Sequence, residues 1–296
     1  MNERYTFIDI YRKDLDLNKD TKVKVSQIII PKIQRPYAQG RLDGVCTYVR
    51  NTLLNEMFAN FKTDEIFDFN FIYGIVRPSN DKYVMELLDG QQRMTTLFLV
   101  YWYIANCELT EADEEDKIIR DALGRFVYET RSTSTVFCHK LASYRIDLSG
   151  QTPSRVIRQA KWYFKSFDRD STITAMLTML DAIHERYINQ DNNALHTKLA
   201  NIQFYVKSLG FFNLSEELYI KMNARGLQLS PFENFKADLM KWIIENISEE
   251  EAVRYASLID NEWTDLFWKE SGANITHCVD EVFFAFINRV FYNLVI

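Results

Sequence analysis

The residues best suited to chemistry lie in the run LLDGQQRMTTL, from Leu87 to Leu97. An apolar strand end is followed by Asp89 and Gly90, then by polar residues that end in Arg93, and then by an apolar helix. A strand–turn–helix of this kind places free backbone N–H groups and the positive end of the helix dipole at the turn. Glycine also permits a positive φ or a close approach of an anion to the backbone. The pattern therefore predicts an anion cradle.

Side chains in the same run offer complementary chemistry. Arg93 carries a planar, permanently charged fork that matches phosphate oxygens, and Thr95 and Thr96 carry hydroxyl donors. Asp89 could hold a metal ion or a water molecule. Spacing alone leaves an equal alternative, in which Asp89 only caps a helix and Arg93 only pairs with a carboxylate.

A second cluster, IPKIQRPYAQGR, follows a strand and ends at Arg41. Its two prolines favour an extended path that leaves the polar side chains outside regular pairing. Gln34, Arg35 and Tyr37 suit a nucleotide, since arginine binds phosphate, glutamine reads base edges and tyrosine stacks on a base. The alternative is a surface loop with a packed tyrosine.

A basic stretch runs from Lys140 to Arg169. We expect Pro153 to open a helix here, on which Arg158, Lys161 and Lys165 share one face. Two interpretations stay open: a stripe that contacts DNA phosphates, and an exposed face that only keeps the protein in solution.

The elements around these clusters predict an α+β protein. Only 9 glycines and 5 prolines occur in 296 residues, too few for the many tight turns of a sandwich or barrel. Alternation and β-branched runs predict strands near residues 22–30, 67–78, 82–88 and 202–209. Apolar spacing predicts helices near residues 42–60, 94–106, 172–187 and 279–296. Capping and proline signals predict that four more helices begin near Thr110, Thr152, Ser230 and Ser248.

Composition narrows the functional classes. The net charge is −6, so overall charge does not indicate non-specific DNA binding, although a local basic face is compatible with it. The four scattered cysteines predict reduced thiols, and the polar N-terminus does not resemble a signal peptide. The longest apolar run, residues 97–105, is about half of a bilayer span. We expect a soluble, cytoplasmic protein, and the uncapped apolar end at Ile296 suggests that the chain continues.

Three segments in order resemble the domain-of-unknown-function 262 family, the N-terminal domain of GmrSD-type, modification-dependent restriction systems. They are PKIQRPY at residues 31–37, DGQQRMTTL at residues 89–97, and ELYIKMNARG followed by LSPFENFK within residues 217–236. One departure concerns Gln39, where family members commonly carry tryptophan. The nuclease half is absent from the sequence, because the four histidines are scattered and form neither a His-Asn-His finger nor an HExxH site.

The resemblance implies a small mixed α/β, ParB- and sulfiredoxin-like nucleotide-binding domain over residues 1–107 and a mainly helical domain over 108–296. It implies a nucleoside-triphosphate-binding and hydrolysing regulatory domain of a DNA-defence system, with Mg²⁺ accompanying the nucleotide. Expected partners are DNA, in modified form, and a nuclease domain or subunit. The alternative function is a non-catalytic DNA-recognition or adaptor module.

Carried over residue by residue, the resemblance assigns two sets of candidates. The phosphate and hydrolysis group would comprise Asp89, Gln92 and Arg93. The nucleotide-binding residues would be Gln34, Arg35, Tyr37, Gly90, Gln91, Arg93 and Thr95. A third set comes from the charge pattern instead: the basic residues Arg158, Lys161 and Lys165 would contact DNA.

Overall fold

A computed structural model describes residues 3–18, 21–31, 34, 36–63, 65–80, 82–148, 151–190, 194–209, 231–259, 263, 266–267 and 279–295. The chain forms two compact units, residues 1–214 and 215–296. The first unit extends past the boundary predicted after residue 107, because two later strands join its sheet. Its elements are β1 (Arg4–Tyr5), α1 (Asp9–Arg12), β2 (Leu15–Asn18), β3 (Thr21–Val23), β4 (Val25–Ile30), α2 (Gly44–Asn60), β5 (Phe67–Ser79), β6 (Lys82–Asp89), α3 (Gln91–Glu108), α4 (Glu114–Gly124), β7 (Phe126–Tyr128), α5 (Ser132–Ser143), α6 (Pro153–Gln159), the 3₁₀ helix η1 (Lys165–Arg169), α7 (Ser171–Tyr187), α8 (Leu195–Lys198), the 3₁₀ helix η2 (Leu199–Asn201) and β8 (Ile202–Ser208).

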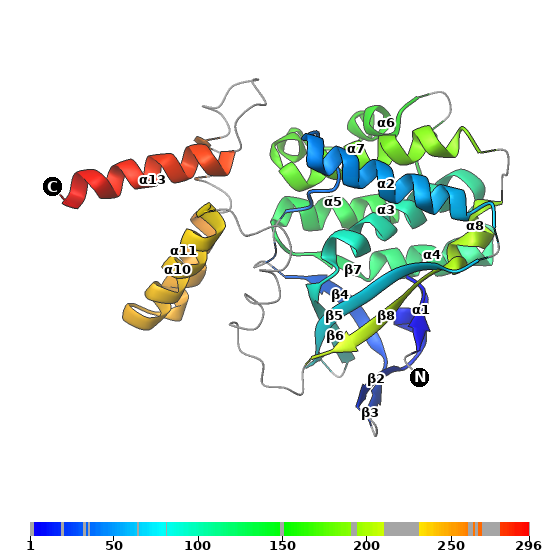
Figure 1. Ribbon diagram of the computed structural model, residues 1–296, viewed down its shortest axis with the longest axis horizontal. Coiled ribbons are helices and arrows are strands. Elements are labelled where there is room, and N and C mark those ends of the chain that lie inside the picture. Colours follow the sequence, from blue (N-terminus) through cyan, green and yellow to red (C-terminus); the bar gives the residue numbers. More distant parts are fainter. Residues whose placement is uncertain are drawn as a thin grey trace. The chain divides into compact units, whose positions relative to one another are not determined.

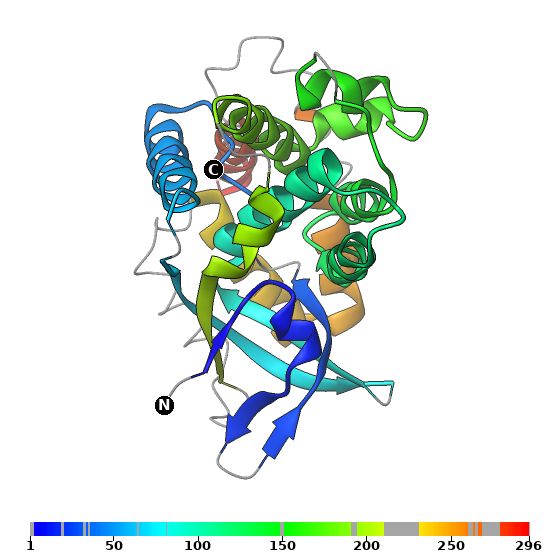
Figure 2. The same ribbon diagram turned by 90° about the vertical axis from the view of Figure 1, so that its right-hand side faces the viewer.

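The first unit is built on a mixed six-stranded sheet with the order β1-β8-β5-β6-β4-β7. The strands predicted near residues 67–78 and 82–88 form an antiparallel hairpin of β5 and β6, and Asn80 takes the left-handed φ of 46° that suits a tight hairpin turn. Strand β4 runs parallel to both β6 and β7, and β8 runs parallel to β5. Helices α2, α3, α5 and α7 gather over one side of the sheet (Figures 1 and 2). The α+β class predicted from the sequence is confirmed.

Helix α3 is the centre of the hydrophobic core. Every residue from Met94 to Ala105 is buried, as expected for a helix that is apolar on all sides. Its few polar groups find partners, because Tyr101 donates to the Leu199 carbonyl at 2.9 Å and Trp102 donates to the Leu141 carbonyl at 2.7 Å. The position of the N-terminus of α3 is therefore fixed by the whole core.

Helix α4 begins three residues later than its sequence signals predict. Thr110 was expected to cap the helix with Asp113 at its third position. In the structure Asp113 is the N-cap residue, and its carboxylate accepts hydrogen bonds from the Thr110 N–H and hydroxyl at 2.7 and 2.8 Å. The two residues interact as the signal predicts, but the helix begins after Asp113 instead of after Thr110.

A buried ion cluster joins α4 to the segment after α5. The Asp116 carboxylate, only 3% exposed, lies 3.2 Å from the Arg120 guanidinium and 2.6 Å from the Arg145 guanidinium. Burial lowers the pKa of Arg120, and Asp116 opposes that effect. Removing the carboxylate would leave two partly buried cations without this anionic partner.

The second unit contains α10 (Pro231–Asn246), α11 (Glu249–Leu258) and α13 (Val279–Val295). Phe232, Ile259 and Phe283 form its small buried cluster. Ser248 caps α11 as predicted, by accepting from the Glu251 N–H at 3.2 Å. Among the described residues of both units, no helix is long and apolar enough to cross a membrane. The described cysteines, Cys46, Cys107 and Cys138, are free thiols.

Candidate functional site

The two segments singled out in the sequence meet at one edge of the sheet. Strands β4 and β6 are parallel neighbours, with Ile28 opposite Met85 and Ile29 opposite Glu86. The loop that ends at Arg41 follows β4, and the turn into α3 follows β6, so both leave the carboxyl ends of adjacent strands. Open α/β sheets bind ligands at such an edge.

Gly90 forms the turn between β6 and α3. Its φ of 92° lies in the left-handed region, and a Cβ at this position would lie 2.4 Å from the Ile72 side chain. Only glycine fits without strain. The first regular hydrogen bond of α3 runs from the Met94 N–H to the Gly90 carbonyl. Within the described part of the chain, no protein acceptor contacts the N–H groups of residues 91, 92 and 93, which precede that bond.

The Arg93 side chain turns towards strand β5. Its Nη1 donates to the Phe69 carbonyl at 2.9 Å, its Nη2 donates to the Phe71 carbonyl at 2.8 Å, and Nη2 lies 3.4 Å from Asp89 Oδ2. The two carbonyls flank Asn70, whose φ of 62° marks an irregularity in β5. Burial lowers the pKa of Arg93, and its side chain is 25% exposed. The guanidinium therefore braces β5 beside the turn, and most of its donors are already used.

Gln92 connects the beginning of α3 to the loop after β4. Its Oε1 accepts from the Ala38 N–H at 2.7 Å, and its Nε2 donates to the Pro36 carbonyl at 3.2 Å. Both ends of the amide are thus engaged with loop backbone. This geometry makes Gln92 a positioning residue for the turn and the loop.

Gln34 makes the reciprocal connection from the loop to the sheet. Its buried side chain donates from Nε2 to the carbonyls of Leu87 and Leu88, at 3.0 and 3.2 Å. Those carbonyls belong to the last residues of β6, directly before the turn. The predicted neighbour Arg35 lies outside the described residues.

The structure places Tyr37 in the core, where it cannot line an exposed wall or stack on a base. Its side chain is fully buried, and its hydroxyl lies 2.7 Å from Thr96 Oγ1, which in turn donates to Gln39 Oε1 at 2.5 Å. Burial raises the pKa of Tyr37. The expectation that Tyr37 faces a nucleotide is wrong for this conformation, because the aromatic ring fills the space beside α3. The packed-tyrosine alternative describes it correctly.

Two further candidates are also covered. Thr95 is fully buried and donates its hydroxyl to the Gln91 carbonyl at 2.8 Å, so it offers no free donor to a ligand. Gln91 is 3% exposed. Asp89 differs from both, because its side chain is 49% exposed beside the turn. Among these three side chains, only the Asp89 carboxylate is accessible beside the turn.

The predicted basic helix face does not form. Helix α6 ends at Gln159, since Ala160 is extended with ψ of 142°, and Lys165 begins the separate 3₁₀ helix η1. Arg158, Lys161 and Lys165 are exposed but do not share one helix. The Arg158 guanidinium lies 3.2 Å from the Asp168 carboxylate. In the turn between α6 and η1, Trp162 is buried and its ring packs against Phe137, which accounts for the break.

Sequence reasoning missed Arg50 as a support of the same loop. Arg50 is 7% exposed and donates from Nη1 to the Arg41 carbonyl at 2.9 Å. The apolar residues that give α2 its helical spacing do not all face inward, because Val45 and Val49 are exposed. The sequence does carry one signal for the burial of Arg50: it lies at helical spacing from Leu54, Met57 and Phe58, the other residues that α2 buries.

Comparison with known proteins identifies the family. Residues 14–240 match the family model described as the GmrSD restriction endonuclease, N-terminal domain. The match covers well over half of the chain, and the chain belongs to this family. A search among curated proteins found no match. Family membership indicates a component of a restriction system and suggests DNA and a nuclease as partners.

Proposed function

We propose that this chain is a nucleoside-triphosphate-binding and hydrolysing regulatory domain of a modification-dependent restriction system, with the phosphates bound at the N-terminus of α3. The carrying observation is the turn at Gly90. It combines a left-handed glycine, three N–H groups without a described protein acceptor, and a helix dipole at the carboxyl edge of the sheet. This combination is the common way for an α/β protein to bind phosphate.

The energetics of such a cradle are sufficient for nucleotide binding. Hydrogen bonds to a charged group contribute about 1.5–3 kcal/mol each. Three of them add up to roughly 4.5–9 kcal/mol, a range that includes the ~8 kcal/mol of micromolar affinity. Because α3 is buried along its length, the N–H groups are held in place before the ligand arrives.

The conspicuous side chains of the motif have a supporting role in this proposal. Gln34 holds the end of β6, Gln92 holds the loop, and Arg93 holds β5. Each of them bonds to backbone on a different segment, so together they fix the distances around the turn. Loss of one of these braces would impair binding by moving the N–H groups.

Among the described side chains at the junction, Asp89 combines a negative charge with the exposure that a catalytic group needs. The described residues contain no group of three or more metal-ligating side chains. Mg²⁺ commonly binds through one or two carboxylates together with substrate phosphates, and Asp89 fits that requirement. Bound there with the nucleotide, Mg²⁺ would neutralise charge on the phosphates. Asp89 would also orient the attacking water.

The proposal is tested by melting the protein with each of the four Mg²⁺–nucleoside triphosphates and by measuring phosphate release with and without modified DNA. We expect a saturable rise in Tm and DNA-dependent release. Asp89→Asn should reduce phosphate release by at least tenfold while the protein stays folded. The matched control is Asp16→Asn, which removes another exposed carboxylate that pairs with a cation, Lys22, at 3.1 Å. No Tm shift with any nucleotide would refute the proposal.

The adaptor alternative has one observation in its favour, the exposed cations Lys161 and Lys165 around the α6–η1 turn. A DNA-recognition module would show no nucleotide effect but an affinity for DNA that falls steeply with salt. Lys161→Ala and Lys165→Ala would each weaken that binding. Arg158→Ala is a less direct test, because its guanidinium already pairs with Asp168.

A further inference from the structure

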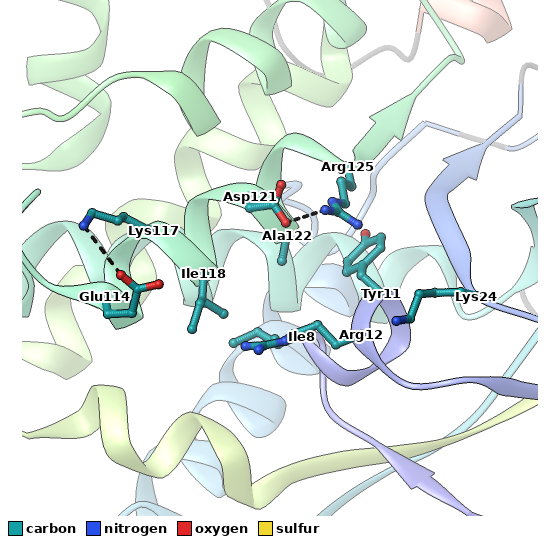
Figure 3. A pocket seen from close by; sticks show the side chains of 10 residues that line it. All are labelled: Ile8, Tyr11, Arg12, Lys24, Glu114, Lys117, Ile118, Asp121, Ala122 and Arg125. Carbon is teal, nitrogen blue, oxygen red and sulfur yellow. Dashed lines mark ion pairs between the residues drawn. The ribbon is translucent and has the colours of Figure 1, made fainter. Parts of the chain in front are cut away.

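A cavity of the first unit lies away from the turn at Gly90. It has a volume of about 580 Å³ and is bounded by α1, by α4 and by Lys24, the residue directly before β4. Figure 3 shows the side chains that line it. Strand β4 spans six residues, which corresponds to roughly 20 Å at ~3.3 Å per residue, and its other end leads to the loop braced by Gln34. The two locations are therefore separate.

The charges around this cavity are unequally compensated. Lys117 pairs with Glu114 at 3.5 Å, and Arg125 pairs with Asp121 at 2.7 Å. Arg12 and Lys24 also line the cavity, and within the described residues neither has a carboxylate partner. Two uncompensated positive charges thus face one cavity from different elements.

The Tyr11 hydroxyl is a second, independent sign of a ligand. Tyr11 is 2% exposed and lines the cavity, yet its hydroxyl oxygen has no hydrogen-bond partner. Figure 3 shows this hydroxyl directed towards Arg125. Burial raises the pKa of Tyr11 well above its usual value, so the group is a neutral donor. Buried polar groups are nearly always paired, and an unpaired donor beside cations favours an anionic acceptor.

We propose that this cavity binds a small molecule bearing a phosphate group, held by Arg12 and Lys24 and accepting a hydrogen bond from Tyr11. A phosphate monoester carries close to two negative charges at neutral pH, which matches the two uncompensated cations. The cavity exceeds the size of the phosphate group, and Ile8 and Ile118 provide apolar surface for the rest of the molecule. This inference does not depend on the proposed function.

The proposal is tested by isothermal titration of the full chain, without Mg²⁺, with inorganic phosphate and with ribose 5-phosphate. We expect saturable binding, tighter for ribose 5-phosphate. Arg12→Ala and Lys24→Ala should each weaken binding about tenfold or more, because each removes a charged contact. Lys117→Ala is the control on the same rim, and it should change Kd by about twofold at most, because that lysine is already paired.

Tyr11→Phe gives a readout that a purely structural tyrosine would not. Since its hydroxyl is unpaired, its removal should leave the ligand-free Tm unchanged or higher, while Kd weakens by about fivefold. Absence of binding by both probes would overturn the proposal, as would unchanged affinity in Lys24→Ala. Binding of a 20-base-pair DNA duplex without binding of either small probe would also overturn it and assign the cations to the DNA backbone.

Discussion

Arg93 provides the sharpest distinction between a side chain that contacts phosphate and one that braces the fold. Arg93→Ala removes two hydrogen bonds from a charged donor to the Phe69 and Phe71 carbonyls, at 2.9 and 2.8 Å. At about 1.5–3 kcal/mol each, the gross loss is roughly 3–6 kcal/mol. The side chain is 25% exposed, so water can replace part of this interaction. We expect the free energy of unfolding to fall by about 2–4 kcal/mol.

The measurement is urea-dependent hydrogen exchange of the α3 amides in the ligand-free protein, which reports on the first unit alone. Arg77→Ala is the matched control, since Arg77 also lies at β5 but is 57% exposed and makes a single surface pair with Glu86 at 3.4 Å. That control should cost less than about 1 kcal/mol. If Arg93→Ala also costs less than about 1 kcal/mol, the bracing role is refuted, and direct phosphate contact becomes the better account of this residue.

Three further changes test other parts of the structure. In urea unfolding, Gly90→Ala should lower the free energy of unfolding by about 2–4 kcal/mol, because alanine is strained at the left-handed φ and its Cβ would clash with Ile72. Gly124→Ala is the control: its Cβ would meet open space, so the change should be neutral or stabilising by up to ~1 kcal/mol. Asp116→Asn should cost about 3 kcal/mol, as judged by Tm, because it removes the buried carboxylate between two partly buried arginines. Asp121→Asn, which changes an exposed pair with Arg125, should cost less than ~1 kcal/mol. Burial raises the pKa of Cys46 from 9.0 to about 11, so its alkylation at pH 8 should be roughly a hundredfold slower than that of a free thiol. Alkylation at the free-thiol rate would contradict this. The stability that the neutral thiol contributes should disappear between about pH 9 and 11.

Local elements were largely predictable because their signals are local. The hairpin of β5 and β6 follows from two extended runs around a polar turn, and α7 at residues 171–187 follows from apolar spacing. The burial of α3 follows from its uninterrupted apolar composition. In each case the residues that define the element are also the residues that form it.

Pairings across the sheet and the burial of single side chains were less accessible. Nothing in the sequence around Phe126 indicates that β7 pairs with β4, because that contact joins residues almost a hundred positions apart. For the same reason, Tyr37 was assigned to an exposed wall and Arg50 was missed. The burial of Tyr37 depends on α3, and that of Arg50 depends on the loop backbone. The break at Ala160 likewise depends on aromatic packing, which overrides a continuous helical spacing of cations.

In this motif the side chains brace neighbouring segments, and the proposed binding groups belong to the backbone. Gln34, Gln92 and Arg93 direct their polar groups at backbone carbonyls and an N–H of neighbouring segments, and these contacts require the amide and guanidinium shapes at these positions. The three N–H groups after Gly90 that have no described protein acceptor belong to the backbone, which is the same whatever the side chain. If the turn binds phosphate as proposed, its backbone N–H groups cannot read a base, so selectivity among nucleotides would have to come from side chains other than these three braces. The proposal therefore predicts strict dependence of binding on the three braces and weak dependence on the identity of the base.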